Sequence, residues 1–294
     1  MFDYHSIHSA ISAVHAKQIF FIGGVAKSGT TWLQILLDLH PNITCKGEGH
    51  FPNNFAPLLR RVLDMHNECI SSKNASIFKE LPGYPRYTEE HYLYLLTSAI
   101  TLLLHQQTEH KSVQTIGEKT PDNICFFPLL DTLFPRAKFI QVVRDGRDSA
   151  VSGWFHNLRV SPEWTRQNFS SIDDYIKMFA EIWATGVSEG SKFGARQPAR
   201  YLEIRYEDLS SDPEGTLEKA FRFLGVEFGR DIVKRCCVDG SFERLSGGRS
   251  RGQANHESFF RKGIAGDWRN YLSEEMNKVF QDKAGEWLAR FGYI

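Results

Sequence analysis

The sequence predicts an α/β protein of one domain, in which a central parallel sheet is flanked by helices. Short, almost continuously apolar segments such as 18–23 and 138–143 alternate with longer segments of helical spacing, a pattern typical of a parallel sheet buried on both faces. A turn of small residues at 23–29 joins the first apolar segment to a helix. The 294 residues suffice for one large domain or two smaller ones. Because no internal repeat or low-complexity linker divides the chain, we assign residues 1–294 to one domain.

The elements of the N-terminal part follow from apolar spacing. In chain order we expect a short amphipathic leader helix within 1–17, a buried strand at 18–23, a helix at 31–39, a loop at 42–54, and helices at 55–70 and 89–107. His40-Pro41 ends the helix at 31–39. The uncharged run Tyr92–Leu104 is too short to span a bilayer, so it indicates a buried helix.

The C-terminal part continues the alternation of strands and helices. We expect a short strand at 115–117, a helix at 122–132, a buried strand at 138–143, helices at 145–158 and 172–189, a strand at 199–205, and helices at 213–224 and 273–291. Residues 238–258 are rich in Gly, Ser and Arg and lack periodicity. A loop of this length is usually functional or mobile.

Charge and cysteine content narrow the function class. Lys+Arg and Asp+Glu both total 35, so the formal net charge is zero. Nucleic-acid or membrane-surface proteins favour a basic excess, so we expect neither partner. The five cysteines have no metal-ligand spacing and are Cys45, Cys69, Cys125, Cys236 and Cys237. We therefore expect reduced thiols, no metal and a cytoplasmic location. The first 18 residues have no apolar signal segment.

The segment 20–32 has the composition of an oxyanion site. An apolar strand leads into a turn that holds Lys27, and the hydroxyl residues Ser28, Thr30 and Thr31 open a helix. Backbone N–H groups and the dipole at a helix start attract anions, and the lysine and hydroxyl groups add charge and donors. A P-loop of the G-x-x-x-x-G-K-[ST] type places its lysine after the last glycine. Here the lysine precedes Ser-Gly-Thr-Thr, so the segment predicts an anion loop that is not a Walker A loop.

A second anion feature follows the strand at 138–143. Arg144 ends this strand, and ligands of open α/β sheets bind outside the carboxyl ends of strands. Arg144 is therefore expected in the same layer as the Lys27 loop. Ser152 lies two helical turns further on, where its hydroxyl can join a phosphate bound near Arg144. The alternative is a strand-end arginine paired with Asp145 or Asp148.

A third anion feature is the pair Arg261 and Lys262, which precedes Gly263. Two adjacent cations form a compact phosphate clamp, and the glycine lets the backbone approach a ligand. A charge pair in a loop is usually solvated surface. Aromatic residues and a further glycine, Gly266, bracket this one, which favours the clamp.

These motifs resemble those of the sulfotransferases that use 3′-phosphoadenosine 5′-phosphosulfate (PAPS), over about Gln18 to Asn270. Lys27–Trp32, including Gly29, is similar to the family's 5′-phosphosulfate loop, Arg144 with Ser152 to its 3′-phosphate site, Arg205–Leu209 to the motif after its fourth core strand, and Arg261–Gly263 with Gly266–Trp268 to its C-terminal phosphate clamp. The order and spacing of the four motifs carry the resemblance. It implies the P-loop NTPase-like sulfotransferase fold and PAPS as cosubstrate.

The resemblance also implies roles for individual residues. Trp32 and Phe242 would flank the adenine and Tyr206 would reach its edge, although core packing is the alternative for the first two. Lys27 would neutralise the bridging oxygen of the leaving nucleotide, while residues 28–31 would hold the 5′-phosphate. Sulfuryl transfer needs in-line attack, charge stabilisation and a base, but no metal.

We also predict a mobile lid over the nucleotide at residues 238–262. Arg261 and Lys262 would draw the loop over the ligand, so we expect residues 238–258 to become ordered when the nucleotide binds.

The predicted base depends on the branch of the family. The cytosolic small-molecule branch has a histidine after Lys-Thr, but Lys119-Thr120 is followed by Pro121. The segments 46–51 and 118–121 instead resemble the carbohydrate-modifying branch and many bacterial members, in which a glutamate follows the first helix. We therefore predict Glu48 as general base.

Three further residues complete this predicted catalytic set. Lys27 and Lys119 are expected to act as electrostatic stabilisers, and His50 is the reserve base. The alternative for Glu48 is a surface ion pair with Lys46.

The sequence thus predicts an EC 2.8.2-type enzyme that sulfates a hydroxyl or amine of a small-molecule acceptor. A carbohydrate acceptor is the alternative, because of the pattern around Glu48. A P-loop kinase would need its lysine after the glycines and an aspartate at the strand end that carries Arg144. A non-catalytic nucleotide-binding module would be expected to lose Lys27 or the base. Acceptor contacts are expected from 49–60, 80–95 and 238–258. The oligomeric state is open.

Overall fold

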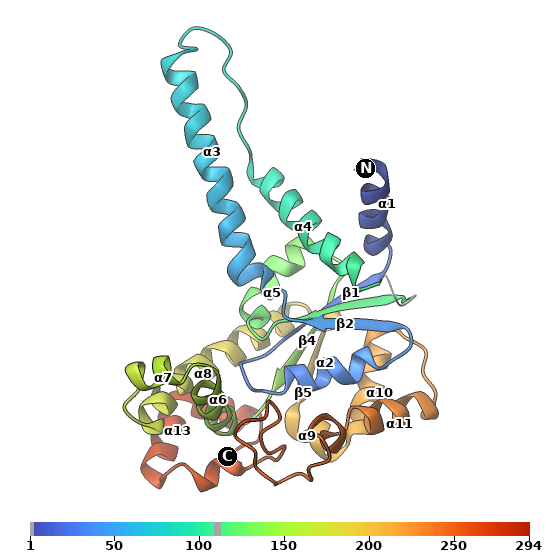
Figure 1. The fold of residues 1–294 in the computed structure, drawn as a ribbon, viewed down its shortest axis with the longest axis vertical. Helices are drawn as coiled ribbons and strands as arrows, with labels where there is room; N and C mark the ends of the chain where they lie inside the picture. The colour runs from blue at the N-terminus through green and yellow to red at the C-terminus, as the bar shows by residue number, and fades with distance from the viewer. Residues whose placement is uncertain (1–2, 109–112) are drawn as a thin grey trace.

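The computed structural model describes residues 3–108 and 113–294 and is built on a five-stranded parallel sheet (Figure 1). The strands lie in the order β2-β3-β1-β4-β5, and each pairs in parallel with its neighbours. Their bounds are Gln18–Gly23 (β1), Ile43–Gly47 (β2), Thr115–Lys119 (β3), Lys138–Val143 (β4) and Tyr201–Arg205 (β5). The predicted central parallel sheet flanked by helices is confirmed.

Helices cover both faces of this sheet. The α-helices are Tyr4–His15 (α1), Thr30–Asp38 (α2), Ala56–Ser76 (α3), Glu89–Gln106 (α4), Asn123–Leu133 (α5), Gly146–Val160 (α6), Pro162–Asn168 (α7), Ile172–Arg196 (α8), Tyr206–Ser211 (α9), Pro213–Leu224 (α10), Arg230–Asp239 (α11), Phe242–Leu245 (α12) and Glu274–Arg290 (α13). Shorter turns are Phe51–Phe55 (η1, π-helical), Pro198–Arg200 (η2) and Asp267–Asn270 (η3). Within the described ranges, no helix has the length and apolar character needed to cross a membrane.

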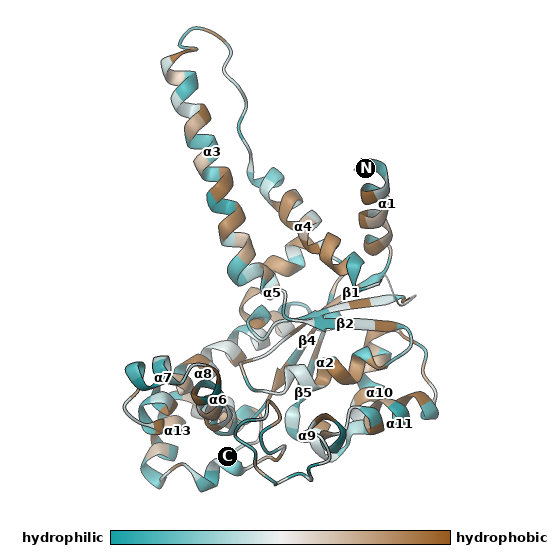
Figure 2. Cartoon of the chain, viewed as in Figure 1, coloured by the Kyte–Doolittle hydropathy of each residue, from teal (hydrophilic) through white to brown (hydrophobic). Residues whose placement is uncertain are grey.

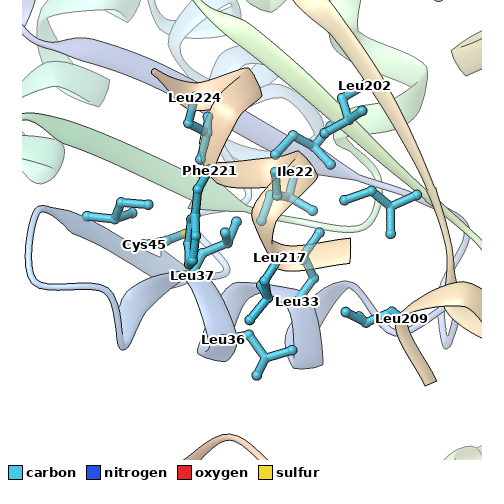
Figure 3. Close-up of a cluster of buried hydrophobic side chains, with 14 of the residues drawn as sticks. Ile22, Leu33, Leu36, Leu37, Cys45, Leu202, Leu209, Leu217, Phe221 and Leu224 are labelled. Atoms are coloured by element: carbon cyan, nitrogen blue, oxygen red, sulfur yellow. The ribbon is translucent and has the colours of Figure 1, made fainter. Parts of the chain in front are cut away.

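Strand residues alternate between two cores. Phe20 and Ile22 pack with α2, α9, α10 and α11 on one face, as the labelled side chains of Figure 3 show for part of this cluster. Ile19 and Phe21 point to the opposite face, where they join α1, α4 and α5. A third cluster joins α6, α8 and α13 around Trp183, which is fully buried. Because both faces are buried, the central strands read as continuous apolar runs.

The predicted loop at 42–54 is wrong, because it contains strand β2 and the turn η1. Only Ile43, Thr44 and Cys45 of β2 are buried, and its last two residues are exposed at the edge of the sheet. Three buried residues are too few to give a recognisable apolar run. The prediction of a loop over 238–258 is wrong in part, since α11 ends inside it and α12 follows.

Other elements differ from expectation in extent. The leader helix is confirmed as α1 for its described residues, whereas residues 1 and 2 lie outside them. The run Tyr92–Leu104 is not a fully buried helix, because Tyr94 and Leu103 are exposed. Strand β3 extends through Glu118 and Lys119. The predicted strand ended at residue 117, because charged residues are not typical of a buried strand. The helices α7, α9 and α11 were not expected, and α3 is longer than predicted.

In the hairpin of α3 and α4, most of α3 and the segment that returns to α4 stand away from the rest of the molecule (Figure 1), whereas α4 packs against α1 and α5. At its base, η1 and α3 follow directly on the turn after β2. This hairpin therefore begins beside the edge of the sheet where the strands end.

Candidate functional site

Each of the five strands delivers a predicted site residue at its carboxyl end. Because the strands are parallel, these residues lie along one edge of the sheet. The residues that follow or end the strands are Lys27 after β1, Glu48 after β2, Lys119 at the end of β3, Arg144 after β4 and Tyr206 after β5. Residues as far apart in the chain as Lys27 and Tyr206 are thereby gathered at one place.

A cavity of about 440 Å³ lies at this edge. It is lined by every predicted site residue except Ser28, His50 and Lys119. The predicted residues that line it are Lys27, Gly29, Thr30, Thr31, Trp32, Glu48, Arg144, Ser152, Tyr206, Phe242, Arg261, Lys262 and Gly263. Lys119 lies directly behind this wall, since its ammonium donates to Thr31 Oγ1 at 3.0 Å.

The Lys27 loop has the backbone geometry of an anion-binding turn. Lys27 and Gly29 adopt positive φ angles of 69° and 99°, and a Cβ atom at position 29 would lie 2.6 Å from Tyr206 Cδ2. Glycine is required at position 29 for both reasons. No side chain caps the start of α2, so its first N–H groups are available for a ligand. The buried hydroxyl of Ser28 has no partner among the described residues.

The ammonium group of Lys27 lies in a cationic, partly buried environment. Burial first, and then the nearby Arg159 and Arg144, lower the pKa of Lys27 to about 8. Its Nζ atom is 4.7 Å from the centroid of the Phe259 ring. A bound anion would offset this accumulation of positive charge.

Arg144 is held in place by backbone carbonyls and an aromatic ring. Its guanidinium donates to the carbonyl oxygens of Lys27 (3.3 Å) and Ile264 (2.9 Å) and lies 4.3 Å from the centroid of the Tyr206 ring. Its Nε has no partner in the described part of the chain. Arg144 approaches Asp148 at 4.0 Å, and Asp145 pairs instead with Arg147.

Asp148 joins the site to the C-terminal clamp. Its carboxylate accepts from the backbone N–H groups of Gly266 (2.6 Å) and Trp268 (2.9 Å). Burial raises the pKa of Asp148, while Arg144 and these two hydrogen bonds oppose that rise. Asp148 therefore fixes the loop before η3 against α6.

The clamp cations converge on one buried carboxylate, which lies within the predicted motif Gly266–Trp268 but was given no role of its own. Arg261 and Lys262 each contact Asp267 at 2.5 Å. Although burial opposes it, hydrogen bonds from Lys262 and Arg261 lower the pKa of Asp267. Gly263 has a φ of 70°, and a Cβ atom there would lie 2.4 Å from Phe242 Cδ2. The loop thus packs against Phe242 through its glycine.

Aromatic residues form the wall beyond Tyr206. Trp32 donates from Nε1 to the carbonyl oxygen of Gly240 at 2.8 Å, and its ring lies 5.7 Å from that of Tyr206. The guanidinium carbon of Arg251 lies 4.9 Å from the centroid of the Trp32 ring. Trp32 and Phe242 are buried and also line the cavity, so core packing and ligand contact are compatible for both.

Glu48 is held by two predicted catalytic residues. One oxygen accepts a short hydrogen bond from Lys119 Nζ, and the other lies 3.3 Å from His50 Nε2. Lys46, the alternative partner, contacts Asp38 at 2.6 Å. The carboxylate is half-exposed toward the cavity.

A buried glutamate supports the turn that carries Glu48. Glu118 accepts hydrogen bonds from Gly49 N (2.8 Å), Thr120 Oγ1 (2.6 Å) and Asn123 Nδ2 (2.7 Å). Burial raises its pKa, and the three hydrogen bonds oppose this rise. Sequence reasoning missed this role, although a carboxylate at the end of a buried strand was a usable indication.

A further wall of the cavity was also missed. His156, Asn157 and Tyr175 line the cavity from α6 and α8, with Phe259 and Phe260 from the loop above. Burial, Lys27 and Arg159 lower the pKa of His156 to about 4, so its imidazole is neutral at pH 7. His156 follows Ser152 by one helical turn, which was the available indication.

Some expected contacts are not found at this cavity. Among the described residues that line it, none comes from 49–60 or 80–95. The second range lies in the projecting hairpin, away from the strand ends. Within the described part of the chain, no group of three or more His, Cys, Asp or Glu side chains could hold a metal ion.

The chain is similar to known sulfotransferases over most of its length. The profile of the sulfotransferase domain family matches residues 17–292. Cytosolic sulfotransferase 3 of Arabidopsis thaliana is 30% identical over 155 residues, which cover 47% of this chain and 49% of that protein. A flavonol sulfotransferase-like protein of Flaveria bidentis is 23% identical and covers 93% of this chain and 82% of its own. The match to the first relative thus spans about half of its length.

Solved structures share the fold. Mouse sulfotransferase SULT7A1 complexed with PAP has a TM-score of 0.60 at 19% identity, covering 98% of this chain and 91% of its own. Retinol dehydratase in complex with androsterone and PAP has a TM-score of 0.52 at 20% identity, covering 97% and 86%.

Proposed function

Because the chain belongs to the sulfotransferase domain family, we propose that it transfers a sulfuryl group from PAPS to a hydroxyl or amine of a small-molecule acceptor. The observation that carries this proposal is the single cavity that combines the Lys27 loop, the buried Arg144 and the Arg261–Lys262 clamp. Such a set suits a ligand with anionic groups at two separate points. We assign residues 1–294 to this one domain and expect a cytoplasmic enzyme without metal, nucleic-acid or membrane partners.

Unsatisfied polar atoms around the cavity support the fit of the nucleotide. Ser28 Oγ, Arg144 Nε and Arg261 Nε are buried without partners among the described residues. Buried polar groups are normally hydrogen-bonded, so these atoms are suited to ligand or water contacts. We propose that residues 27–31 hold the 5′ end of PAPS, and that Arg144, Ser152 and residues 261–263 hold its 3′-phosphate.

The aromatic wall would hold the base of the nucleotide. Trp32 and Phe242 would flank the adenine, and Tyr206 would reach its edge. All three side chains are buried and line the cavity. Their contacts with Gly240, Arg144 and Gly263 hold the three side chains in place before the nucleotide binds.

Glu48 is the proposed general base. PAPS supplies the activated sulfuryl group, and positioning and electrostatics are then the main requirements. Glu48 would take the proton of the acceptor, while Lys119 and His50 hold its two carboxylate oxygens. Lys27 would stabilise negative charge on the leaving nucleotide. His50 stays the reserve base, and its Nε2 lies 3.3 Å from Glu48 Oε2.

The acceptor would lie between Glu48 and the wall formed by His156, Asn157 and Tyr175. This wall offers ring surface and several hydrogen-bonding groups, which suits a small alcohol, phenol or amine. The names of relatives, such as the flavonol sulfotransferase-like protein, point to the same class. A carbohydrate is the second candidate, favoured by the paired Glu48 and Lys119.

Residues 238–262 are proposed to act as a lid. Arg249 holds this segment together, because it donates to the carbonyl oxygens of Gln253 (2.9 Å), Arg261 (3.0 Å) and Phe260 (2.5 Å). Hydrogen exchange should slow across 238–258 when the product nucleotide binds. Unchanged exchange there would count against a lid.

The proposed function is tested by calorimetric binding of adenosine 3′,5′-bisphosphate beside ATP and AMP, without metal. Binding that requires the 3′-phosphate is expected and would justify an acceptor screen with PAPS. Equal or tighter binding of ATP, or no binding of the bisphosphate, would reopen the kinase interpretation.

The role of Glu48 is tested separately. Glu48→Gln should abolish most sulfuryl transfer and leave binding of the bisphosphate unchanged. Glu90→Gln, at an exposed position on α4, is the matched control. Full turnover by Glu48→Gln would reject Glu48 as base without rejecting the family.

A further inference from the structure

Helix α3 and the segment that returns from it to α4 form a projection. One face of α3 packs against this returning segment. The 21 residues of α3 span about 30 Å at ~1.5 Å per residue. Arg60 pairs with Glu89, and the Asn67 side chain both donates to and accepts from the backbone of Tyr87, at 2.9 and 2.8 Å. Asn74 makes the same pair of hydrogen bonds with Tyr84, each at 3.0 Å. These contacts identify the side of α3 that faces the returning segment.

The opposite side of α3 carries an uncovered apolar stripe. Leu58, Val62 and Met65 are 61%, 62% and 59% exposed, and Cys69 is also exposed. The intervals of four, three and four residues are those of the a and d positions of a heptad repeat. Figure 2 shows apolar residues recurring along α3 where it stands away from the body of the molecule.

Two opposite charges flank this stripe on one side. Arg61 and Glu68 lie seven residues apart, both exposed, at the position just before Val62 and Cys69 respectively. Neither has a partner among residues 3–108 and 113–294 in the structure. Residues one heptad apart occupy the same flank of a helix.

We propose that the stripe Leu58–Cys69 of α3 is a self-association surface, on which α3 of a second copy of this chain packs antiparallel. In that arrangement Val62 lies against Met65 of the second copy, and Leu58 against Cys69 of the second copy. The same register sets Arg61 against Glu68 of the second copy, and two-fold symmetry repeats each contact. A parallel pair would instead set Arg61 against His66. Charge complementarity therefore favours the antiparallel pair.

Oligomeric state is the first test, measured by sedimentation equilibrium over a range of concentrations. We expect a dimer for the unaltered chain and a monomer for Val62→Glu. Ile182→Glu, at an exposed position on α8 that is 49% exposed, is the matched control and should stay dimeric. A monomeric unaltered chain, including one that binds lipid vesicles through the stripe, would overturn the proposal. So would a dimer that is indifferent to Val62→Glu.

Charge exchange tests the register. Arg61→Glu alone should weaken the dimer by about tenfold, because it places like charges together twice. The double variant R61E/E68R should restore the dimer. A double variant as weak as the single one would refute the proposed pairing.

Cross-linking tests the direction of packing. Leu58→Cys should form a disulfide-linked dimer with native Cys69 of the second copy under mild oxidation, whereas L58C/C69S should not. A cross-link that survives in L58C/C69S would indicate parallel helices and overturn the antiparallel arrangement. These tests need no catalytic turnover, so they stand apart from the proposed function.

Discussion

Binding of the nucleotide should depend on the protonation of Lys27. Its ordinary pKa of 10.5 is lowered to about 8, chiefly by burial and then by Arg159 and Arg144. The ammonium form attracts an anion and the neutral amine does not. Affinity for adenosine 3′,5′-bisphosphate should therefore fall as the pH rises through 8.

The expected size of this effect follows from the two-state titration. If only the ammonium form binds, the dissociation constant grows by the factor 1 + 10^(pH − pKa), which is about tenfold between pH 7 and pH 9. Stability of the ligand-free protein should change in the opposite direction. Between pH 8 and 10.5 the unfolded lysine holds its proton while the folded one loses it, so this residue's contribution to the free energy of unfolding rises with pH.

Calorimetry at pH 7, 8 and 9 in buffers of different ionisation enthalpy measures both affinity and proton uptake. Uptake should approach one proton at pH 9 and be about a tenth of a proton at pH 7. Lys27→Arg should remove the pH dependence, because arginine stays charged. Lys192→Arg, at an exposed position on α8, is the control. Equal affinity at pH 7 and 9 without proton uptake, or an unchanged slope in Lys27→Arg, would refute the reasoning.

Three further predictions concern positioning and stability. Glu118→Gln places an amide N–H₂ group among groups that all donate hydrogen bonds to the native carboxylate. Turnover should therefore fall about tenfold, with little change in bisphosphate affinity. A parallel loss of affinity would contradict the positioning role. Gly263→Ala should weaken bisphosphate binding about tenfold, because a positive φ and the Phe242 ring both oppose a Cβ atom; unchanged calorimetry would show that the loop adapts. Leu36→Ala removes a fully buried side chain of α2 and should lower the free energy of unfolding by ~2–5 kcal/mol in urea denaturation. Leu81→Ala, at an exposed leucine outside the α3 stripe, should change it little.

Much of the fold could be predicted because its strands are buried on both faces. The bounds of β1 and β4 agree with the predicted ranges, since continuous apolar runs leave little ambiguity. Edge strand β2 escaped prediction because only three of its residues are buried. The helices α9 and α12 are six and four residues long, too short for helical spacing to be visible.

For the site, the sequence identified local motifs, and the structure added contacts between residues that are distant in the chain. The Lys27 turn, Arg144 and the clamp at 261–263 could be found because each is a short pattern beside a strand or glycine. The roles of Glu118, Asp267 and His156 were missed. Their importance depends on which groups lie beside them across the fold, such as Gly49 for Glu118 or both clamp cations for Asp267.

The sequence by itself determined the alternation of strands and helices, the anion-binding chemistry of three segments and the absence of net charge. These properties reside in neighbouring residues, whose spacing fixes local structure. Tertiary structure alone decided that Lys119 rather than Lys46 contacts Glu48, and that five strand ends share one cavity. It also decided that one face of α3 is left uncovered. Such contacts depend on strand order and helix direction, because both bring together residues that are remote in the chain.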